Sequence, residues 1–194
     1  MLDKEFWDNR YKNHQTGWDI GQPSTPLKVF FDSLENKELA ILIPGCGRAY
    51  EAEYLFKKGF KNISVIDISP TALNEFSERF SDFPKNKLIC NDFFKHNGTY
   101  DLIIEQTFFC AIDPILRVDY VKHSSKLLKK GGKIIGLLFA EQFANDHPPF
   151  GGTKEEYSNL FSKNYTIEKM DIAINSIDAR KGRELFISFK NKIA

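Results

Sequence analysis

The sequence predicts an α/β fold with a doubly wound, mostly parallel sheet of seven strands. Short apolar segments alternate with helical segments along the chain, which is typical of parallel strands joined by crossover helices. The first of these segments runs into the turn Gly45-Cys46-Gly47. The second ends in an acid, Asp67, 22 residues after Gly45. Two further strands near the C-terminus flank a basic turn, which predicts a closing antiparallel hairpin.

Seven segments are predicted to be the strands. Five are short continuous apolar runs, the pattern of strands that are buried on both faces of a parallel sheet. They lie at residues 38–43, 63–69, 87–92, 100–106 and 133–139. The last two strands, at 165–174 and 183–190, are predicted to form the hairpin.

Cap residues and helical spacing predict the helices between these strands. Ser69-Pro70 is a good N-cap and first-turn pair, and Thr153 with Glu156 forms a capping box. Helices are expected at residues 3–13, 26–34, 48–58, 70–80, 113–130 and 153–161.

Length and composition narrow the class of protein. A chain of 194 residues is long enough for one domain with a full core. The net charge of +1 gives no general affinity for polyanions, so nucleic acid is not expected as a partner. Three cysteines, an odd number, argue against a disulfide framework. No signal pattern and no apolar run approaching about 18 residues is found, so a cytoplasmic protein without a membrane span is expected.

The glycine turn and the acid after the next strand predict a nucleotide-like ligand. Gly45 and Gly47 lack a Cβ, so a ligand can approach the backbone closely there. The following helix offers free N–H groups, and the Asp67 carboxylate can accept hydrogen bonds from both hydroxyls of a ribose. This combination is the sugar-binding device of a Rossmann-like fold, at the carboxyl ends of the strands.

Two cofactor classes use that device. A dinucleotide needs a third glycine, but the pattern here is Gly45-x-Gly47-x-x-Tyr50, which counts against NAD or FAD. S-adenosylmethionine carries no phosphate and tolerates the substitution. Asp92, at the end of the third strand, suits the exocyclic amine of adenine, although it is also placed to cap a turn. Phe93 can offer its backbone N–H or its ring. A methyltransferase is therefore favoured over a dehydrogenase.

Five separated segments carry a family resemblance. They read "GWDIGQPSTPL", "LIPGCGRAYE", "VIDIS", "YDLIIEQTFFCAIDPILR" and "PPFGGTKEEY". In this order they resemble the thiopurine S-methyltransferase family of S-adenosylmethionine-dependent enzymes, and most closely its halide and thiol methyltransferase branch. The resemblance covers residues 6–183. It implies a Rossmann-like class I methyltransferase fold in one domain, 1–194, in which 1–34 cover the cofactor and 35–194 form the core, and it implies a monomer.

The resemblance also implies which residues contact S-adenosylmethionine. Trp7, Tyr11 and Trp18 have the spacing of three tryptophans in the halide/thiol branch, where this segment closes over the cofactor; Tyr11 departs from tryptophan but keeps a ring. Aromatic faces suit a sulfonium cation. The remaining expected cofactor contacts are Gly45 at the turn, Asp67 at the ribose, Asp92 and Phe93 at the adenine, and Gln106 at the methionine moiety. Gln106 departs from the Tyr or Arg that relatives carry there.

The activity implied is methyl transfer to a small soft nucleophile by in-line displacement. A halide, thiocyanate, bisulfide or thiolate needs no general base, and the sequence offers no catalytic triad and no metal set, so no catalytic or metal-binding residue is expected. Alternatives left open are a thiopurine-like aryl-thiol or metalloid methyltransferase, or a cofactor-binding module that has lost catalysis.

The substrate pocket implied by the resemblance is largely aromatic. It is expected to contain Trp18, Phe108, Phe109, Phe139, Phe150 and Arg180, with a role in the core as the alternative for the phenylalanines. Arg180, in the basic turn, either attracts an anion or is solvated. His147 lies in a loop that flanks the substrate side in relatives. Cys46 and Cys110 are expected to fill buried space rather than to act as nucleophiles.

Overall fold

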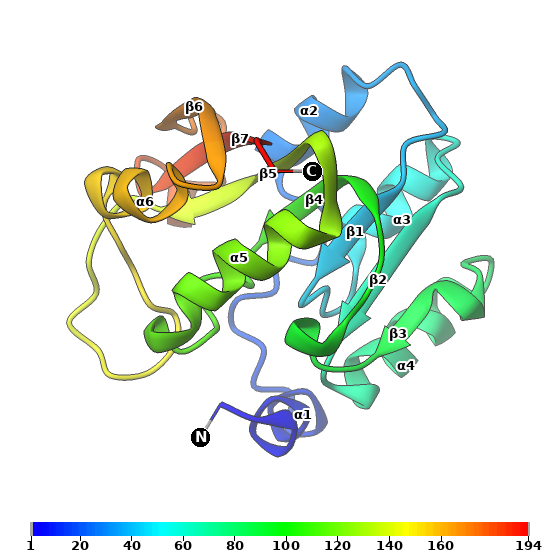
Figure 1. Cartoon of the computed structure of the whole chain (residues 1–194). Coiled ribbons are helices and arrows are strands. Elements are labelled where there is room, and N and C mark those ends of the chain that lie inside the picture. Colours follow the sequence, from blue (N-terminus) through cyan, green and yellow to red (C-terminus); the bar gives the residue numbers. More distant parts are fainter. Residues whose placement is uncertain (1, 194) are drawn as a thin grey trace.

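A single seven-stranded sheet organises the computed structural model, which describes residues 2–193 (Figure 1). The strand order is β3-β2-β1-β4-β5-β7-β6. β7 pairs antiparallel with both β5 and β6, whereas the other pairings are parallel. The strands are β1 (Ile41–Pro44), β2 (Ile63–Asp67), β3 (Leu88–Cys90), β4 (Tyr100–Gln106), β5 (Leu128–Phe139), β6 (Tyr165–Ile172) and β7 (Glu184–Asn191). The predicted fold class, a mostly parallel sheet with an antiparallel C-terminal hairpin, is confirmed.

Helices cover both faces of the sheet because successive strand residues point to opposite sides. Along β4, Ile103 packs in a core with α5 and α6, whereas Leu102 and Ile104 pack in a core with α2, α3 and α4. The helices are α1 (Lys4–Lys12), α2 (Thr25–Asp32), α3 (Tyr50–Lys57), α4 (Pro70–Arg79), α5 (Arg117–Leu127) and α6 (Lys154–Phe161). Within residues 2–193, no helix combines the length and the apolar character needed to cross a membrane.

The chain between residues 113 and 133 differs from the predicted helix. A short 3₁₀ turn, Pro114–Leu116, precedes α5, and β5 already begins at Leu128. The glycines expected to end the helix instead lie within β5, where Gly131 has a φ of +77° and the register with β4 shifts. Glycine at a strand irregularity is common because it adopts this φ without strain.

The N-terminal helix α1 is attached to the start of α4. The Asp8 carboxylate accepts hydrogen bonds from the Ser69 hydroxyl at 2.8 Å and from the Thr71 N–H at 3.0 Å. Lys12 lies 2.7 Å from the same carboxylate. Partial burial alone would raise the pKa of Asp8, but the hydrogen bonds from Lys12, Thr71 and Ser69 hold it well below its usual range. Figure 1 shows α1 beyond the strand ends, next to α4.

Candidate functional site

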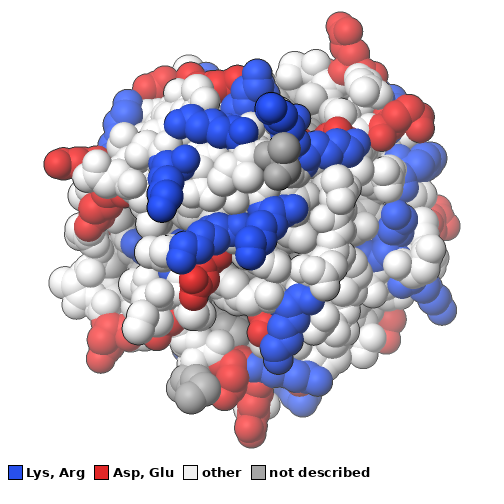
Figure 2. Space-filling view, in the orientation of Figure 1, with Lys and Arg blue, Asp and Glu red and all other residues white. Residues whose placement is uncertain are grey.

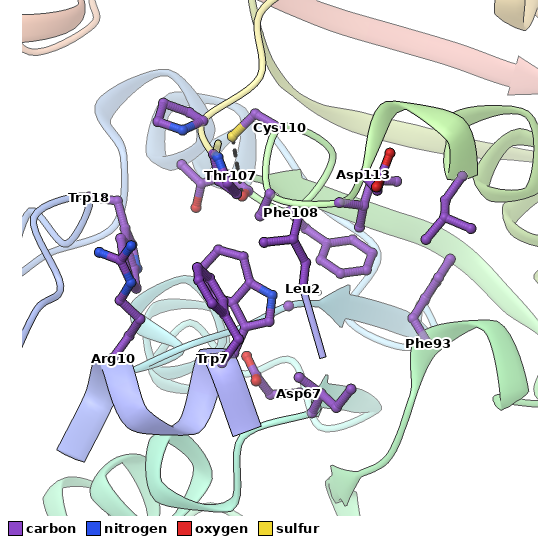
Figure 3. Close-up of a pocket in the computed structure, with 18 of the residues that line it drawn as sticks. Leu2, Trp7, Arg10, Trp18, Asp67, Phe93, Thr107, Phe108, Cys110 and Asp113 are labelled. Atoms are coloured by element: carbon purple, nitrogen blue, oxygen red, sulfur yellow. Dashed lines mark hydrogen bonds between the residues drawn. The ribbon is translucent and has the colours of Figure 1, made fainter. Parts of the chain in front are cut away.

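A cavity of about 770 Å³ opens at the carboxyl ends of the parallel strands (Figure 3). This is the edge of a doubly wound sheet where ligands bind. Its walls come from α1, from the ends of β1, β2 and β3, from the turn after β4, and from the loops around residues 143–149 and 179–183. Ten of the residues predicted for the cofactor or substrate line it: Trp7, Tyr11, Trp18, Gly45, Asp67, Asp92, Phe93, Phe108, Phe139 and Arg180.

A side chain at either glycine of the turn after β1 would clash with a neighbouring aromatic residue. Gly45 and Gly47 have φ values of +55° and +52°. A Cβ on Gly45 would lie 2.8 Å from Cγ of Phe108, and a Cβ on Gly47 would lie 2.7 Å from the Tyr11 hydroxyl. Both distances are too short for carbon contacts. The turn therefore requires glycine for its backbone and for the approach of the neighbouring rings.

Replacing Gly45 with Ala is expected to weaken S-adenosylhomocysteine binding and to lower the melting temperature. The new Cβ would displace the Phe108 ring, and a left-handed φ costs a non-glycine residue about 1–2 kcal/mol. Gly21→Ala is the matched control, because Gly21 also has a positive φ but has open space where its Cβ would be. Calorimetric titration of both variants should show a loss of affinity for Gly45→Ala alone; equal affinities would contradict the role of the turn.

Asp67 is buried at the end of β2 and faces the cavity. One carboxylate oxygen accepts from the Gly47 N–H and the other from the Ser69 N–H, each at 2.8 Å. Burial raises the pKa of Asp67, and these backbone bonds partly offset the rise. A carboxylate oxygen can accept two hydrogen bonds, so each still has capacity for a ligand hydroxyl. The pair of oxygens therefore suits a ribose diol.

The aromatic residues of the N-terminal segment meet over the cavity. The ring centroid of Trp18 lies 5.7 Å from that of Trp7 and 5.9 Å from that of Tyr11, both in edge-to-face contact. Burial, together with the Asp67 charge, raises the pKa of the Tyr11 phenol well above its usual value, so it stays neutral. The three rings form an apolar cover that can exclude water from a bound cation.

Asp92 and Phe93 line the opposite end of the cavity. Asp92 accepts from the Phe94 N–H at 2.9 Å, so it caps a short 3₁₀ turn, Phe93–Lys95. Capping uses one oxygen and leaves the other available, so the two roles considered for Asp92 are compatible. The Phe93 ring is packed against Phe108, with 5.2 Å between centroids, and stacked on Tyr120 at 5.5 Å. This end of the cavity is a rigid aromatic wall.

Three predicted site residues do not line the cavity. Phe109 is 1% exposed and packs among Tyr120, Tyr157 and Phe161, because only one of two adjacent phenylalanines in this turn, Phe108, can face inward. Phe150 donates its N–H to the Cys110 carbonyl while Pro148 and Pro149 occupy the wall.

Gln106 is the third. In the alternation of β4, Gln106 is on the same face as Leu102 and Ile104, which pack against α2, α3 and α4. Its Oε1 is buried and has no hydrogen-bond partner among residues 2–193. The sequence position matched a cofactor contact in relatives, but the strand's alternation turns this side chain away.

The structure places three residues whose roles the sequence left open. The Arg180 guanidinium donates to the Trp18 carbonyl at 2.6 Å and lies 3.5 Å from Glu184, so it joins the basic turn to the cover rather than being solvated. His147 is exposed and does not line the cavity. Cys110 is buried, and burial raises the pKa of its thiol to about 12, so no thiolate forms near neutral pH.

The sequence reasoning missed several cavity residues, among them Arg10, Thr107 and Phe143, whereas Arg183 belongs to the predicted basic turn. Arg10 was detectable, because it follows Trp7 by three residues and therefore shares its helix face. Arg183 pairs with Glu141, and its guanidinium carbon lies 5.6 Å from the centroid of the Phe143 ring. Nothing in the local pattern indicates that these two distant segments meet.

Comparison with known proteins agrees with this geometry. "Probable thiol methyltransferase 2" of Arabidopsis thaliana is 29% identical over 185 residues, which cover 92% of this chain and 81% of that protein. "Thiocyanate methyltransferase 1" of the same plant is 30% identical over 190 residues, with the same coverage. The fold matches that of Burkholderia thailandensis 1,6-didemethyltoxoflavin-N1-methyltransferase, solved with S-adenosylhomocysteine, at a TM-score of 0.78, 13% identity and coverage of 97% and 86%.

The family model described as thiopurine S-methyltransferase matches residues 2–190. The match spans the N-terminal cover, the glycine turn and the C-terminal hairpin. Together with the cradle at Gly45 and Gly47 and the buried acid Asp67, it means that the chain belongs to the thiopurine S-methyltransferase family and is an S-adenosylmethionine-dependent methyltransferase.

Proposed function

We propose that this enzyme methylates a small, soft, anionic nucleophile: a halide, thiocyanate, bisulfide or thiolate. The observation that carries the proposal is the composition of the cavity wall beside the cover. This part of the wall combines aromatic and proline side chains with two guanidinium groups, and none of its described residues is a histidine. Its residues are Trp18, Phe139, Phe143, Pro148, Pro149, Arg180 and Arg183. Such a wall excludes water and presents two guanidinium groups, each also paired with a carboxylate, and it contains no histidine base, which suits an acceptor that arrives already deprotonated. The printed names of the thiol and thiocyanate methyltransferases support the same class.

The residues of this chain divide the work of such a reaction. When bound, S-adenosylmethionine supplies an electrophilic methyl group on a sulfonium. Asp67 holds the ribose, and the turn at Gly45 allows the close approach that fixes its position. The rings of Trp7, Tyr11 and Trp18 exclude water, which strengthens the attraction between an anion and the sulfonium. No proton moves, so alignment in a dry cavity provides the catalysis.

A second candidate acceptor is a bulkier aryl thiolate. The volume of about 770 Å³ lies well within the range of roughly 300–1,000 Å³ for sites that hold drug-sized ligands. The cofactor would occupy part of this space, so the support for a larger acceptor comes from relatives named thiopurine S-methyltransferase, such as that of Acinetobacter baylyi. The same aromatic wall would contact the ring of an aryl thiolate.

The first test measures cofactor binding and then turnover of candidate acceptors. S-adenosylhomocysteine at 100 times its Kd should stabilise the native state by about 2.7 kcal/mol and raise the melting temperature. The protein should then be incubated in sealed vials with S-adenosylmethionine and iodide, thiocyanate or bisulfide, and the volatile methylated product measured in the headspace.

The outcomes distinguish the proposals. Turnover of these anions supports the small-anion acceptor. If none of the three anions is methylated but thiophenol is, measured as S-adenosylhomocysteine released, the acceptor is an aryl thiolate. A melting shift without turnover of any of them points to an acceptor of another class, and no melting shift contradicts every version.

A further inference from the structure

The cavity wall contains three arginines, and they differ in how they are engaged. Arg180 is bound to the Trp18 carbonyl and to Glu184, and Arg183 pairs with Glu141. Arg10, on α1, takes part in none of the ion pairs or hydrogen bonds recorded for side chains of residues 2–193. Its guanidinium carbon lies 5.1 Å from the centroid of the Phe6 ring. The donors of Arg10 are therefore available to a ligand.

The position of Arg10 follows from α1. Arg10 is three residues after Trp7, so both project from the same helix face into the cavity. Its neighbour Tyr11 places its hydroxyl at Gly47, which sets this part of α1 above the glycine turn. Figure 3 shows Arg10 beside Trp18 at one side of the cavity, Phe93 at the other side, and Asp67 between them.

This order matches the order of chemical groups along S-adenosylmethionine. Adenine is followed by the ribose, then by the sulfonium, and then by the methionine portion with its α-carboxylate. Phe93 and Asp67 suit the first two groups, and the aromatic cover suits the third. A carboxylate enclosed by aromatic rings is costly unless it meets a charged donor. Gln106, the residue expected at this group, faces the helix layer instead.

We propose that Arg10 binds the α-carboxylate of the cofactor. The guanidinium presents paired N–H donors in a plane, the geometry that suits both oxygens of a carboxylate. α1 then has two functions, covering the sulfonium with Trp7 and Tyr11 and neutralising the far end of the same molecule. The inference rests on the proposal that the cofactor occupies this cavity. It assigns to Arg10 the contact with the methionine moiety that the family resemblance had placed at Gln106.

The test compares ligands that do and do not carry the carboxylate. S-adenosylhomocysteine, its decarboxylated analogue S-adenosyl-3-thiopropylamine and 5′-methylthioadenosine would be titrated by calorimetry into the wild-type protein, Arg10→Gln and Arg10→Lys. Lys4→Gln, which removes an exposed charge from the same helix, is the matched control. Melting temperatures of the free proteins check that each variant is folded.

Arg10→Gln should bind S-adenosylhomocysteine about 10- to 100-fold more weakly, the loss of a charge-assisted hydrogen-bond pair. Its affinity for the two ligands without a carboxylate should equal that of the wild-type protein. Arg10→Lys should recover part of the loss, and Lys4→Gln should behave as wild type.

Three other outcomes would overturn the assignment. The first is an unchanged affinity of Arg10→Gln for S-adenosylhomocysteine. If the KM for the acceptor were raised in the same variant, Arg10 would bind the acceptor anion instead. An equal loss for all three ligands would show that Arg10 only supports the cover. Absence of S-adenosylhomocysteine binding by the wild-type protein would instead reject the cofactor site as a whole, Arg10 included.

Discussion

Replacing Asp67 with Ala is expected to remove most of the affinity for S-adenosylhomocysteine, by about 100-fold or more. The two ribose hydroxyls would lose a charged acceptor, and hydrogen bonds to charged groups are the strong ones. The Gly47 and Ser69 N–H groups, which now donate to this carboxylate, would also lose their partner. Calorimetric titration of the purified variant measures the effect.

Two companion variants make that measurement decisive. Asp82→Ala removes an exposed carboxylate outside the cavity and should bind as the wild-type protein does. Asp67→Asn keeps the shape but replaces one acceptor oxygen by a donor, so its affinity should fall between those of the wild type and Asp67→Ala. If Asp67→Ala and Asp82→Ala bound equally well, the ribose assignment would be wrong.

Glu105 is expected to make the stability of the protein depend on pH between about 4.5 and 7. This β4 residue is 1% exposed and accepts hydrogen bonds from the Phe108 and Phe109 N–H groups and from the Tyr120 hydroxyl. Burial raises the pKa of Glu105 from 4.5 to about 7, despite the opposing effect of those bonds. Protonation therefore favours the folded state. The stabilisation is complete below the unfolded pKa and is lost as the pH rises through the folded pKa.

Glu105→Gln isolates this contribution because the amide resembles the protonated acid at every pH. The free energy of unfolding of the wild-type protein should fall relative to that of Glu105→Gln by about 3 kcal/mol between pH 4.5 and 7.5, at about 1.36 kcal/mol per pKa unit. Urea unfolding at a series of pH values measures the difference. Glu35→Gln, an exposed control, should track the wild type. A constant gap between wild type and Glu105→Gln would mean that Glu105 keeps an ordinary pKa.

Features set by local geometry could be predicted from the sequence. The glycine turn and Asp67 follow from a strand ending at a tight turn and from the carboxyl-end rule for parallel sheets. The cover residues followed from the family resemblance, and the cavity wall includes Trp7, Tyr11 and Trp18. The first two inferences needed only neighbouring residues and a spacing, whereas the cover needed the resemblance.

Features set by tertiary contacts could not be predicted. The choice of Phe108 over Phe109 as a wall residue depends on the turn that begins at Thr107, with a φ of +59°, and on the buried carboxylate of Glu105. Gln106 matched a family position, but by the alternation of β4 it lies on the same face as Leu102 and Ile104, which pack against α2, α3 and α4. Motif spacing contains no information on these side-chain directions.

Ser69 bonds both Asp67, the residue proposed to bind the ribose, and α1. Its N–H donates to Asp67, and its hydroxyl donates to Asp8 of α1. If α1 moves away from the cavity, the hydrogen bonds of Asp8 to Ser69 and Thr71 break, one of them at the residue whose N–H supports Asp67. Under the proposed function, we expect the release of S-adenosylhomocysteine, and with it the turnover number, to depend on how readily α1 detaches from Ser69.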